Sequence, residues 1–254
     1  MRRILILGGT AEARQLAGRL AGRGDLAVTL SLAGRTASPA PQPVPVRIGG
    51  FGGADGLAEY LSDECIDVLV DATHPYAATI SANAAKAVAE SGARLLALRR
   101  PPWEKVSGDL WNEVDTLAEA VQVLGDEARR VFLALGRKDL VPFLHAPQHD
   151  YLIRSVDPVD PPLALPRAKY ITGRGPFTEE HDGALMAAHH IEVVIAKNSG
   201  GDATYGKIVA ARALGIEVIM LRRPVLPDVT SVGSVEDAVR WLDHLPAPKT
   251  KRGV

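Results

Sequence analysis

The sequence of 254 residues contains a single cysteine and no long apolar segment. Because Cys65 stands alone, an intrachain disulfide and a thiolate metal cluster are both excluded. Cys65 lies just before an apolar run, so we interpret it as a small buried hydrophobe rather than as a nucleophile. No apolar stretch approaches the roughly 20 residues that a membrane-spanning helix needs.

The N-terminus also lacks the apolar core of a signal peptide, because the run Ile4–Leu7 is short and ends at a glycine turn. Charge of one sign is not in excess: 29 Lys and Arg face 30 Asp and Glu, a net charge of −1, whereas a nucleic-acid binder usually shows a basic face. We therefore expect a cytoplasmic protein with neither a nucleic-acid nor a membrane partner.

Several catalytic signatures are missing as well. The Ser-His-Asp order, H-E-x-x-H, C-x-x-C and the P-loop do not occur. His189 and His190 are adjacent and so do not share a helix face, which argues against a metal pair, and no metal site is expected.

What is present is a regular alternation of short apolar runs and amphipathic segments over the first hundred residues. The spacing predicts helices between successive strands. The apolar runs predict buried strands at Ile4–Leu7, Ala27–Leu32, Val44–Ile48, Val68–Val70 and Arg94–Leu98. Strands that are buried on both faces and alternate with helices predict a doubly wound parallel sheet.

A second unit of the same kind follows Arg100-Pro101-Pro102-Trp103. Its apolar runs predict strands at Val131–Leu135, Tyr151–Arg154, Val193–Ala196 and Glu217–Leu221. The motif Arg-Arg-Pro ends corresponding strands in the two halves, at Arg99 and at Arg222. The predicted fold is α/β, with two Rossmann-like lobes (residues 1–99 and 100–254), parallel sheets flanked by helices, and a ligand cleft between the lobes.

The first candidate site is the turn Gly8-Gly9-Thr10-Ala11-Glu12 between the first strand and its helix. Glycines allow a pyrophosphate to approach a helix N-terminus, where free N–H groups and the positive end of the dipole favour an anion. Only part of the G-x-G-x-x-G fingerprint is present, so a turn that merely packs well is the alternative. Glu12 is expected to face ribose hydroxyls or solvent.

The end of the second strand carries Arg35 and no acidic residue. In dinucleotide-binding units an acidic residue at this place binds the ribose 2′-hydroxyl, whereas an arginine accommodates a 2′-phosphate. Arg35 therefore favours NADPH over NADH, and a surface arginine on a loop is the alternative.

The segment Gly49–Gly53 places four glycines around one aromatic residue, after the third strand. Such a loop favours positive φ angles or a close approach to a ligand. Gly50, Phe51 and Gly52 are candidates for the adenosine side of the cofactor, with a flexible turn as the alternative.

Asp71-Ala72-Thr73-His74-Pro75-Tyr76 follows the fourth strand, where the nicotinamide half of the cofactor should lie. Thr73 is a candidate cofactor ligand. His74 and Tyr76 are candidate proton carriers, although a histidine held by the backbone is the structural alternative.

The second lobe has a similar candidate anion-binding turn, which follows a strand and precedes a helix, at Lys197-Asn198-Ser199-Gly200-Gly201. Ser199 and Gly200 are candidate contacts to cofactor phosphates. Further cations that follow strands predict an anionic substrate, although each by itself could be a solvated loop residue. The candidate substrate-binding residues are Arg137, Lys138, Arg174 and Lys207.

Five of these motifs together resemble the precorrin-6A reductase family, in that family's order and over nearly the whole chain. The segments that carry the resemblance are Ile6–Glu12, Ala33–Thr36, Gly49–Gly53, Asp71–Ala77 and Lys197–Gly201.

The resemblance implies NADPH-dependent reduction of one carbon–carbon double bond of the precorrin-6A macrocycle, which gives precorrin-6B in cobalamin biosynthesis. Its substrate is a large, flat tetrapyrrole polycarboxylate, and a cobalt-containing form is not excluded by the motifs. We also expect transient contacts with neighbouring enzymes of the corrin pathway. The proton donor stays open among His74, Tyr76, Lys197, water and the macrocycle itself.

Two other functions compete with this one. Another Rossmann-type NADP-dependent oxidoreductase, of the extended dehydrogenase or epimerase kind, would usually carry Tyr-x-x-x-Lys, and neither Tyr60 nor Tyr76 is followed by lysine at that spacing; Tyr205 has Lys207 too close. A non-catalytic NADPH-sensing module would bind the cofactor without transferring hydride to a tetrapyrrole.

Overall fold

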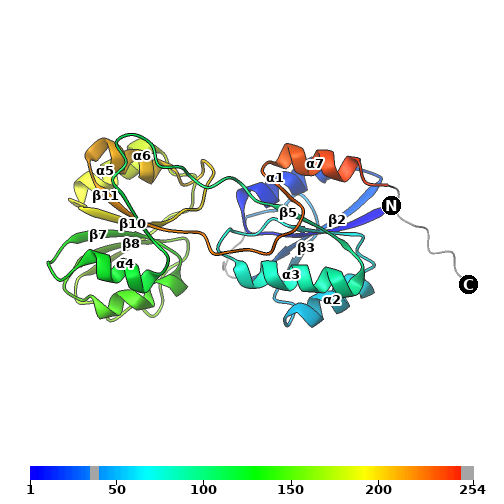
Figure 1. Cartoon of the computed structure of the whole chain (residues 1–254), viewed down its shortest axis with the longest axis horizontal. Coiled ribbons are helices and arrows are strands. Elements are labelled where there is room, and N and C mark those ends of the chain that lie inside the picture. The colour runs from blue at the N-terminus through cyan, green and yellow to red at the C-terminus, as the bar shows by residue number, and fades with distance from the viewer. Residues whose placement is uncertain (35–39, 247–254) are drawn as a thin grey trace, which may run out of the picture. The chain divides into compact units, whose positions relative to one another are not determined.

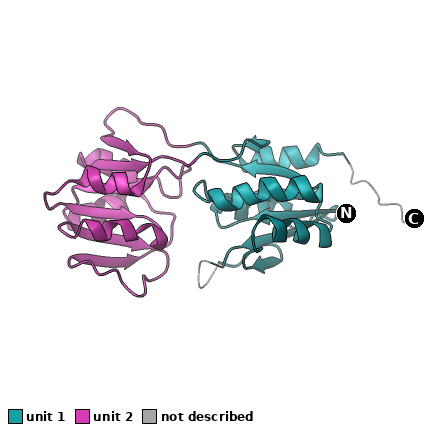
Figure 2. Ribbon diagram, turned by 60° about the horizontal axis from the view of Figure 1, so that its bottom comes forward, with its two compact units in different colours: residues 1–101, 225–254 teal, residues 102–224 magenta. Residues whose placement is uncertain are grey.

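The computed structural model describes residues 1–34 and 40–246, which form two compact units (Figure 1, Figure 2). Unit 1 consists of Met1–Pro101 and the chain from Val225 onward, and unit 2 consists of Pro102–Pro224. The predicted boundary near residue 100 agrees with this division. The prediction that 100–254 form one lobe is wrong for its last part, because the chain returns to unit 1 after Pro224.

Unit 1 contains a sheet of six strands that pair in parallel throughout. The strands are β1 (Arg2–Leu7), β2 (Leu26–Leu32), β3 (Val46–Ile48), β4 (Val68–Asp71), β5 (Arg94–Leu98) and β12 (Ser231–Val232). Their order is β3-β2-β1-β4-β5-β12, which places the switch point of the doubly wound sheet between β1 and β4.

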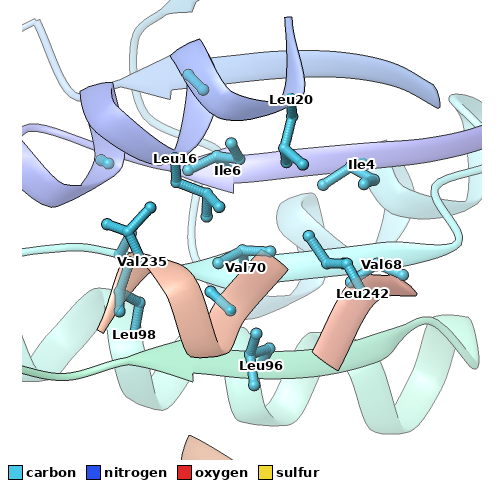
Figure 3. Close-up of a cluster of buried hydrophobic side chains, with 14 of the residues drawn as sticks. Ile4, Ile6, Leu16, Leu20, Val68, Val70, Leu96, Leu98, Val235 and Leu242 are labelled. Atoms are coloured by element: carbon cyan, nitrogen blue, oxygen red, sulfur yellow. The ribbon is translucent and has the colours of Figure 1, made fainter. Parts of the chain in front are cut away.

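Two pairs of helices cover the faces of this sheet (Figure 1). One pair is α1 (Ala11–Leu20) with α7 (Val235–Asp243), and the other is α2 (Ala54–Asp63) with α3 (Ala78–Ser91). Ile4 and Ile6 of β1 pack into the core beside α1 and α7 (Figure 3), whereas Leu5 and Leu7 pack into the core beside α2 and α3. Because both faces are buried, the strand reads as a continuous apolar run.

Unit 2 contains a second parallel sheet of six strands, in the order β9-β8-β7-β10-β11-β6. The strands are β6 (Trp111–Val114), β7 (Arg130–Ala134), β8 (Asp150–Ser155), β9 (Ala168–Thr172), β10 (Val193–Lys197) and β11 (Glu217–Leu221). The helices are α4 (Leu117–Leu124), α5 (Glu179–Ala188), α6 (Gly206–Leu214) and the 3₁₀ turns η1 (Arg137–Asp139) and η2 (Val141–His145). The predicted α/β class with two parallel sheets is confirmed.

The chain passes twice between the units, so that the sixth strand of each sheet follows a strand of the other unit; we call this the strand exchange. After β5 of unit 1 the chain passes into β6, which pairs with β11 of unit 2. After β11 it passes into β12, which pairs with β5. Each exchanged strand leads into a helix whose first turn is capped by a hydroxyl, that of Thr116 for α4 and that of Ser234 for α7. The Arg-Arg-Pro motifs at Arg99 and Arg222 follow β5 and β11, which hold the same place in their sheets, as predicted.

The strands that were not predicted are β6, β9 and β12. Cys65 is a further correction: it is exposed, with a φ of 48°, in the turn between α2 and β4, and is not part of the core. Among the described residues no helix has the length and apolar character needed to cross a membrane.

Candidate functional site

In unit 1 the predicted site residues gather at the carboxyl edge of the sheet. Because all strands are parallel, the turns that follow β1, β3 and β4 lie at the same edge. They contain the predicted residues Gly8–Glu12, Gly50–Gly52 and Thr73–Tyr76. In doubly wound sheets ligands bind at this edge, beside the switch point. Arg35 lies outside the described residues.

The turn after β1 is built for close packing and for a free helix end. A Cβ atom on Gly8 would lie 2.6 Å from Leu30 Cδ1, so glycine lets the turn pack against β2. Gly9 has a φ of 114°, and a Cβ atom there would meet open space. Thr10 caps α1 by accepting a hydrogen bond from Ala13 N at 3.1 Å, and Ala11 is the exposed first residue of the helix. The geometry fits an anion at this helix N-terminus.

Thr10 also connects the two strands that flank the switch point. Its hydroxyl donates a hydrogen bond of 2.8 Å to the carbonyl oxygen of Ala72, in the turn after β4. The same oxygen caps α1. The Thr10 hydroxyl therefore fixes the turns after β1 and β4 relative to each other.

Glu12 was expected to face either ribose hydroxyls or solvent, and the structure does not place it toward solvent. Its carboxylate forms an ion pair of 2.6 Å with Arg100, and the two side chains are 22% and 15% exposed. This brings an arginine beside the first turn of α1, where an anion is expected.

The glycine loop after β3 is organised by Arg47, a residue that the sequence did not reveal. Its guanidinium donates hydrogen bonds to Gly49 O at 2.6 Å and Gly50 O at 2.7 Å. It also stacks on the Phe51 ring, 3.8 Å from the centroid, and Phe51 packs edge-on against Tyr60. These contacts give the loop a defined shape.

The turn after β4 is held by the buried carboxylate of Asp71. Asp71 Oδ1 accepts hydrogen bonds from the Thr73 hydroxyl at 2.6 Å and from Thr73 N at 3.2 Å. Asp71 Oδ2 accepts from the Ser81 hydroxyl of α3 at 2.6 Å. Thr73 is half-buried, so its side chain is fixed in place while part of it still reaches the surface.

His74 and Tyr76 lie next to each other in this turn. Their ring centroids are 5.6 Å apart, and His74 Nδ1 accepts a hydrogen bond from Tyr76 N at 3.3 Å. An accepting Nδ1 places the proton of the neutral ring on Nε2. Both side chains are half-buried at the ligand edge.

In unit 2, Lys197 is tied to the turn after β7. Its amine forms an ion pair of 2.6 Å with Asp139 of η1. The neighbouring cations Arg137 and Lys138 are exposed, and Arg137 donates to Pro158 O at 3.4 Å. Arg174 is exposed on the loop after β9. These cations lie at the carboxyl edge of their own sheet, which is the edge expected to bind an anionic ligand.

The loop after β10 is fixed through its carbonyl groups. Arg223 donates to Asn198 O at 2.9 Å and Ser199 O at 3.0 Å, and the Trp103 indole donates to Gly201 O at 2.8 Å. Gly200 and Gly201 both have a φ of 68°, a conformation that side chains rarely adopt. The loop therefore has a defined backbone shape.

Lys207 is buried, which does not favour its predicted role as a substrate-binding residue. It is 4% exposed, and its amine donates to Thr204 O at 2.5 Å and lies 4.9 Å from the Trp103 ring centroid. Burial, together with the nearby Arg154 charge, lowers the pKa of Lys207 to about 7, while Asp182 opposes the shift. Asp182 is itself paired with Arg154 at 2.5 Å. Lys207 supports the loop from within unit 2.

The edge of unit 1 defines the class of the protein. A parallel sheet in this strand order, with a glycine turn that leads from β1 into the N-terminus of a helix, is the Rossmann type of nucleotide-binding fold. Among the described residues no group of three His, Cys, Asp or Glu side chains is arranged to hold a metal ion.

Comparison with known proteins identifies the family. The model of the family described as "Precorrin-6x reductase CbiJ/CobK" matches residues 3–243. The chain belongs to this family. Membership makes the chain an oxidoreductase and implies a nicotinamide cofactor.

Individual relatives match over nearly their whole length. A Precorrin-6A reductase from Sinorhizobium sp. is 58% identical over 246 residues, which cover 97% of this chain and 94% of that protein. A Cobalt-precorrin-6A reductase from Priestia megaterium is 30% identical over 250 residues, covering 94% and 97%. A solved structure described as CobK precorrin-6A reductase has a TM-score of 0.93 and 47% identity, and covers 98% of this chain and 99% of that one.

The residues of unit 1 fit a nicotinamide dinucleotide. Gly9 leaves open space beside the N-terminus of α1, as a phosphate would require. Thr73, His74 and Tyr76 lie after β4, on the side of the switch point opposite β2. The unit thus offers an anion-binding turn and polar side chains on both sides of the switch point.

Proposed function

We propose that this chain catalyses the NADPH-dependent reduction of one carbon–carbon double bond of precorrin-6A, which gives precorrin-6B in cobalamin biosynthesis. The observation that carries the proposal is the joining of the turn after β1 to the turn after β4, through the Thr10 hydroxyl and Ala72 O. This pair of turns supports a dinucleotide that crosses the switch point of unit 1.

The relatives support a cobalt-free substrate. The proteins named Precorrin-6A reductase from Sinorhizobium sp. and Rhodobacter capsulatus are 58% and 48% identical to this chain. Three relatives named Cobalt-precorrin-6A reductase are 30%, 30% and 25% identical. We therefore propose precorrin-6A as the preferred substrate.

The roles of the cofactor-binding residues follow from their positions. When bound, NADPH supplies the hydride. Gly9 and the first N–H groups of α1 hold its phosphates, and Arg100 adds a positive charge close to them. Gly50, Phe51 and Gly52 border its adenosine side, and Arg47 holds that loop in shape. Ser199 and Gly200 stay candidates for further phosphate contacts.

The choice of NADPH over NADH depends on Arg35. We propose that its guanidinium binds the 2′-phosphate, for which a planar fork of N–H donors is suited. This proposal comes from the position of Arg35 in the sequence after β2.

The substrate carries many carboxylates, and exposed cations at the carboxyl edge of a sheet suit them. Arg137 and Lys138 are exposed at the carboxyl edge of unit 2, and Arg174 is exposed on the loop after β9. Lys197 is paired with Asp139, so we assign it a smaller part in charge recognition. His74 and Tyr76 are the proposed proton donors, with Lys197 as a further candidate.

The test is an anaerobic incubation of the purified protein with precorrin-6A, followed through NADPH oxidation and the visible spectrum of the macrocycle. We expect NADPH to be oxidised only when precorrin-6A is present, and faster than NADH. Cobalt-precorrin-6A serves as the matched substrate control and should react more slowly.

Absence of turnover with authentic precorrin-6A, in protein that still binds NADPH, would overturn the proposal and favour the cofactor-sensing alternative. A cytoplasmic location and transient contacts with neighbouring pathway enzymes stay predictions.

A further inference from the structure

Three hydroxyl side chains lie around the switch point of unit 1, and their hydrogen bonds differ. The Thr10 hydroxyl donates to Ala72 O and accepts from Ala13 N, so it is engaged in both directions. Ser81 is 4% exposed, and its hydroxyl donates to Asp71 Oδ2. Thr73 is half-buried and its hydroxyl donates to Asp71 Oδ1.

Asp71 settles the direction of the Thr73 hydrogen bond. Its Oδ1 is also 3.2 Å from Thr73 N, and a backbone N–H can only donate. Asp71 is 5% exposed and acts as the acceptor in all three hydrogen bonds. Asp71 Oδ1 thus accepts from both donors of Thr73, and the Thr73 hydroxyl proton lies toward Asp71.

The consequence is that the Thr73 oxygen presents lone pairs and no proton. Within the described residues, no hydrogen-bond donor is assigned to this oxygen. A ligand group that meets Thr73 must therefore be a donor. An acceptor at the same place would face the lone pairs of Thr73 without a hydrogen bond between them.

The position of Thr73 indicates which ligand group this is. It follows β4, on the opposite side of the switch point from β2, where the second half of a dinucleotide lies. A nicotinamide ring has its hydrogen-bond donor in the carboxamide NH₂.

We propose that Thr73, oriented by Asp71, is a specificity-determining residue that accepts a hydrogen bond from the carboxamide NH₂ of the nicotinamide. This inference rests on the proposed function and goes further, because it assigns one side-chain atom to one group of the cofactor.

The experiment measures binding of NADP⁺ and of its 3-acetylpyridine analogue by calorimetry. The analogue keeps the ring carbonyl but has a methyl group where the amide has NH₂. We expect the wild-type chain to bind NADP⁺ about three- to tenfold more tightly than the analogue, the range of one neutral hydrogen bond.

The variants isolate the hydroxyl. Thr73→Val keeps the shape but removes the acceptor, so it should weaken NADP⁺ binding, leave the analogue nearly unchanged and bring the affinity ratio close to one. Thr73→Ser keeps the hydroxyl and should keep the ratio. Thr79→Val, at an exposed residue of α3, is the matched control and should also keep it.

Asp71→Asn gives an independent check where its circular dichroism spectrum matches the wild type. The neutral amide is a weaker acceptor than the carboxylate and has one acceptor oxygen where Asp71 has two, so it holds the Thr73 proton less firmly and the ratio should fall although Thr73 is still present.

An unchanged ratio in Thr73→Val, or equal weakening of both ligands, would overturn this inference and leave the proposed function standing. Failure of the wild-type chain to bind either ligand would overturn both.

Discussion

Glu12 and Arg100 lie 88 positions apart in the chain and form an ion pair of 2.6 Å beside the first turn of α1. The pair is largely shielded from solvent, with side chains 22% and 15% exposed. It places one positive and one negative charge next to the helix end that is expected to hold the cofactor phosphates. The acidic partner opposes anion binding, while the basic partner assists it.

Replacement of Glu12 by glutamine should therefore strengthen cofactor binding. The substitution removes a negative charge beside the phosphates while Arg100 keeps its positive charge, so we expect NADP⁺ to bind up to about fivefold more tightly, which corresponds to about 1 kcal/mol. Calorimetric titration checks this.

The result also decides between two roles of Glu12. If the carboxylate instead holds ribose hydroxyls, as the sequence also suggested, Glu12→Gln will weaken NADP⁺ binding. Glu59→Gln, at an exposed position of α2, is the control for a change of net charge alone.

Arg35→Ala should separate the two nicotinamide cofactors. Loss of a charged hydrogen bond to the 2′-phosphate is expected to weaken NADPH binding by roughly 1.5–3 kcal/mol and to leave NADH binding nearly unchanged. Dissociation constants for both cofactors give the answer. Arg94→Ala, at an exposed residue where β5 begins, should alter neither. Equal weakening of both cofactors would show that Arg35 does not bind the 2′-phosphate.

Gly56→Ala, in the first turn of α2, should disturb the backbone of the glycine loop at Phe51. A Cβ atom at Gly56 would lie 1.9 Å from the carbonyl oxygen of Phe51, so the backbone of the loop must move. We expect a loss of about 1–3 kcal/mol in the free energy of unfolding, together with weaker NADPH binding. Gly50→Ala is the matched control for the change in stability, because a Cβ atom there meets open space within the protein. Urea unfolding followed by circular dichroism measures the difference, and equal stabilities of the two variants would contradict the prediction.

Lys207 should make the stability of unit 2 depend on pH. Burial lowers the pKa of Lys207 from its ordinary 10.5 to about 7, so between these values the unfolded chain binds more protons than the folded one. The free energy of unfolding should then rise with pH by up to about 1.4 kcal/mol per unit. Below about pH 7 both states are protonated and the full penalty of burying the charge is present. Lys207→Met should abolish this rise.

The measurement can be confined to unit 2. Trp103 and Trp111 lie in unit 2, and Trp241 lies in unit 1. In a Trp241→Phe background, fluorescence during urea unfolding at about pH 7 and about pH 9 therefore follows unit 2. Lys169→Met, at an exposed residue of β9, should keep the pH dependence of the wild type. A Lys207→Met variant that still gains stability as the pH rises would show that another group is responsible.

The interior strands could be predicted from the sequence because helices cover both faces of each sheet. β1 and β10, for example, lie at the centres of their sheets and read as unbroken apolar runs. The missed strands β6, β9 and β12 lie at sheet edges. β6 has Asn112 and Glu113 exposed between its buried ends, so its sequence resembles a loop.

The site was predicted in part, for a related reason. Glycine turns that follow strands can be recognised in a sequence, because the backbone conformation that requires glycine is set by a few consecutive residues. Arg47 and Asp71 were not assigned roles, since what they do depends on partners that only folding brings close: Phe51 for Arg47, and Ser81 for Asp71. Lys207 was predicted to be an exposed substrate ligand, although it is buried, because a lysine is rarely buried and nothing in the neighbouring sequence indicates burial. The exchange of β6 and β12 was missed because it depends on pairing between distant segments.

That exchange has a consequence for the order in which the chain can fold during synthesis. Unit 2 is continuous in sequence, from Pro102 to Pro224, and has all its strands once that stretch has emerged from the ribosome. Unit 1 begins first but must wait, because β5 lacks its neighbour β12, and α1 lacks its neighbour α7, until the last part of the chain is made. A fragment that stops at Pro101 would leave a strand edge unpaired and an apolar face uncovered, which is the condition for aggregation. The domain that starts the chain is thus the last to be completed.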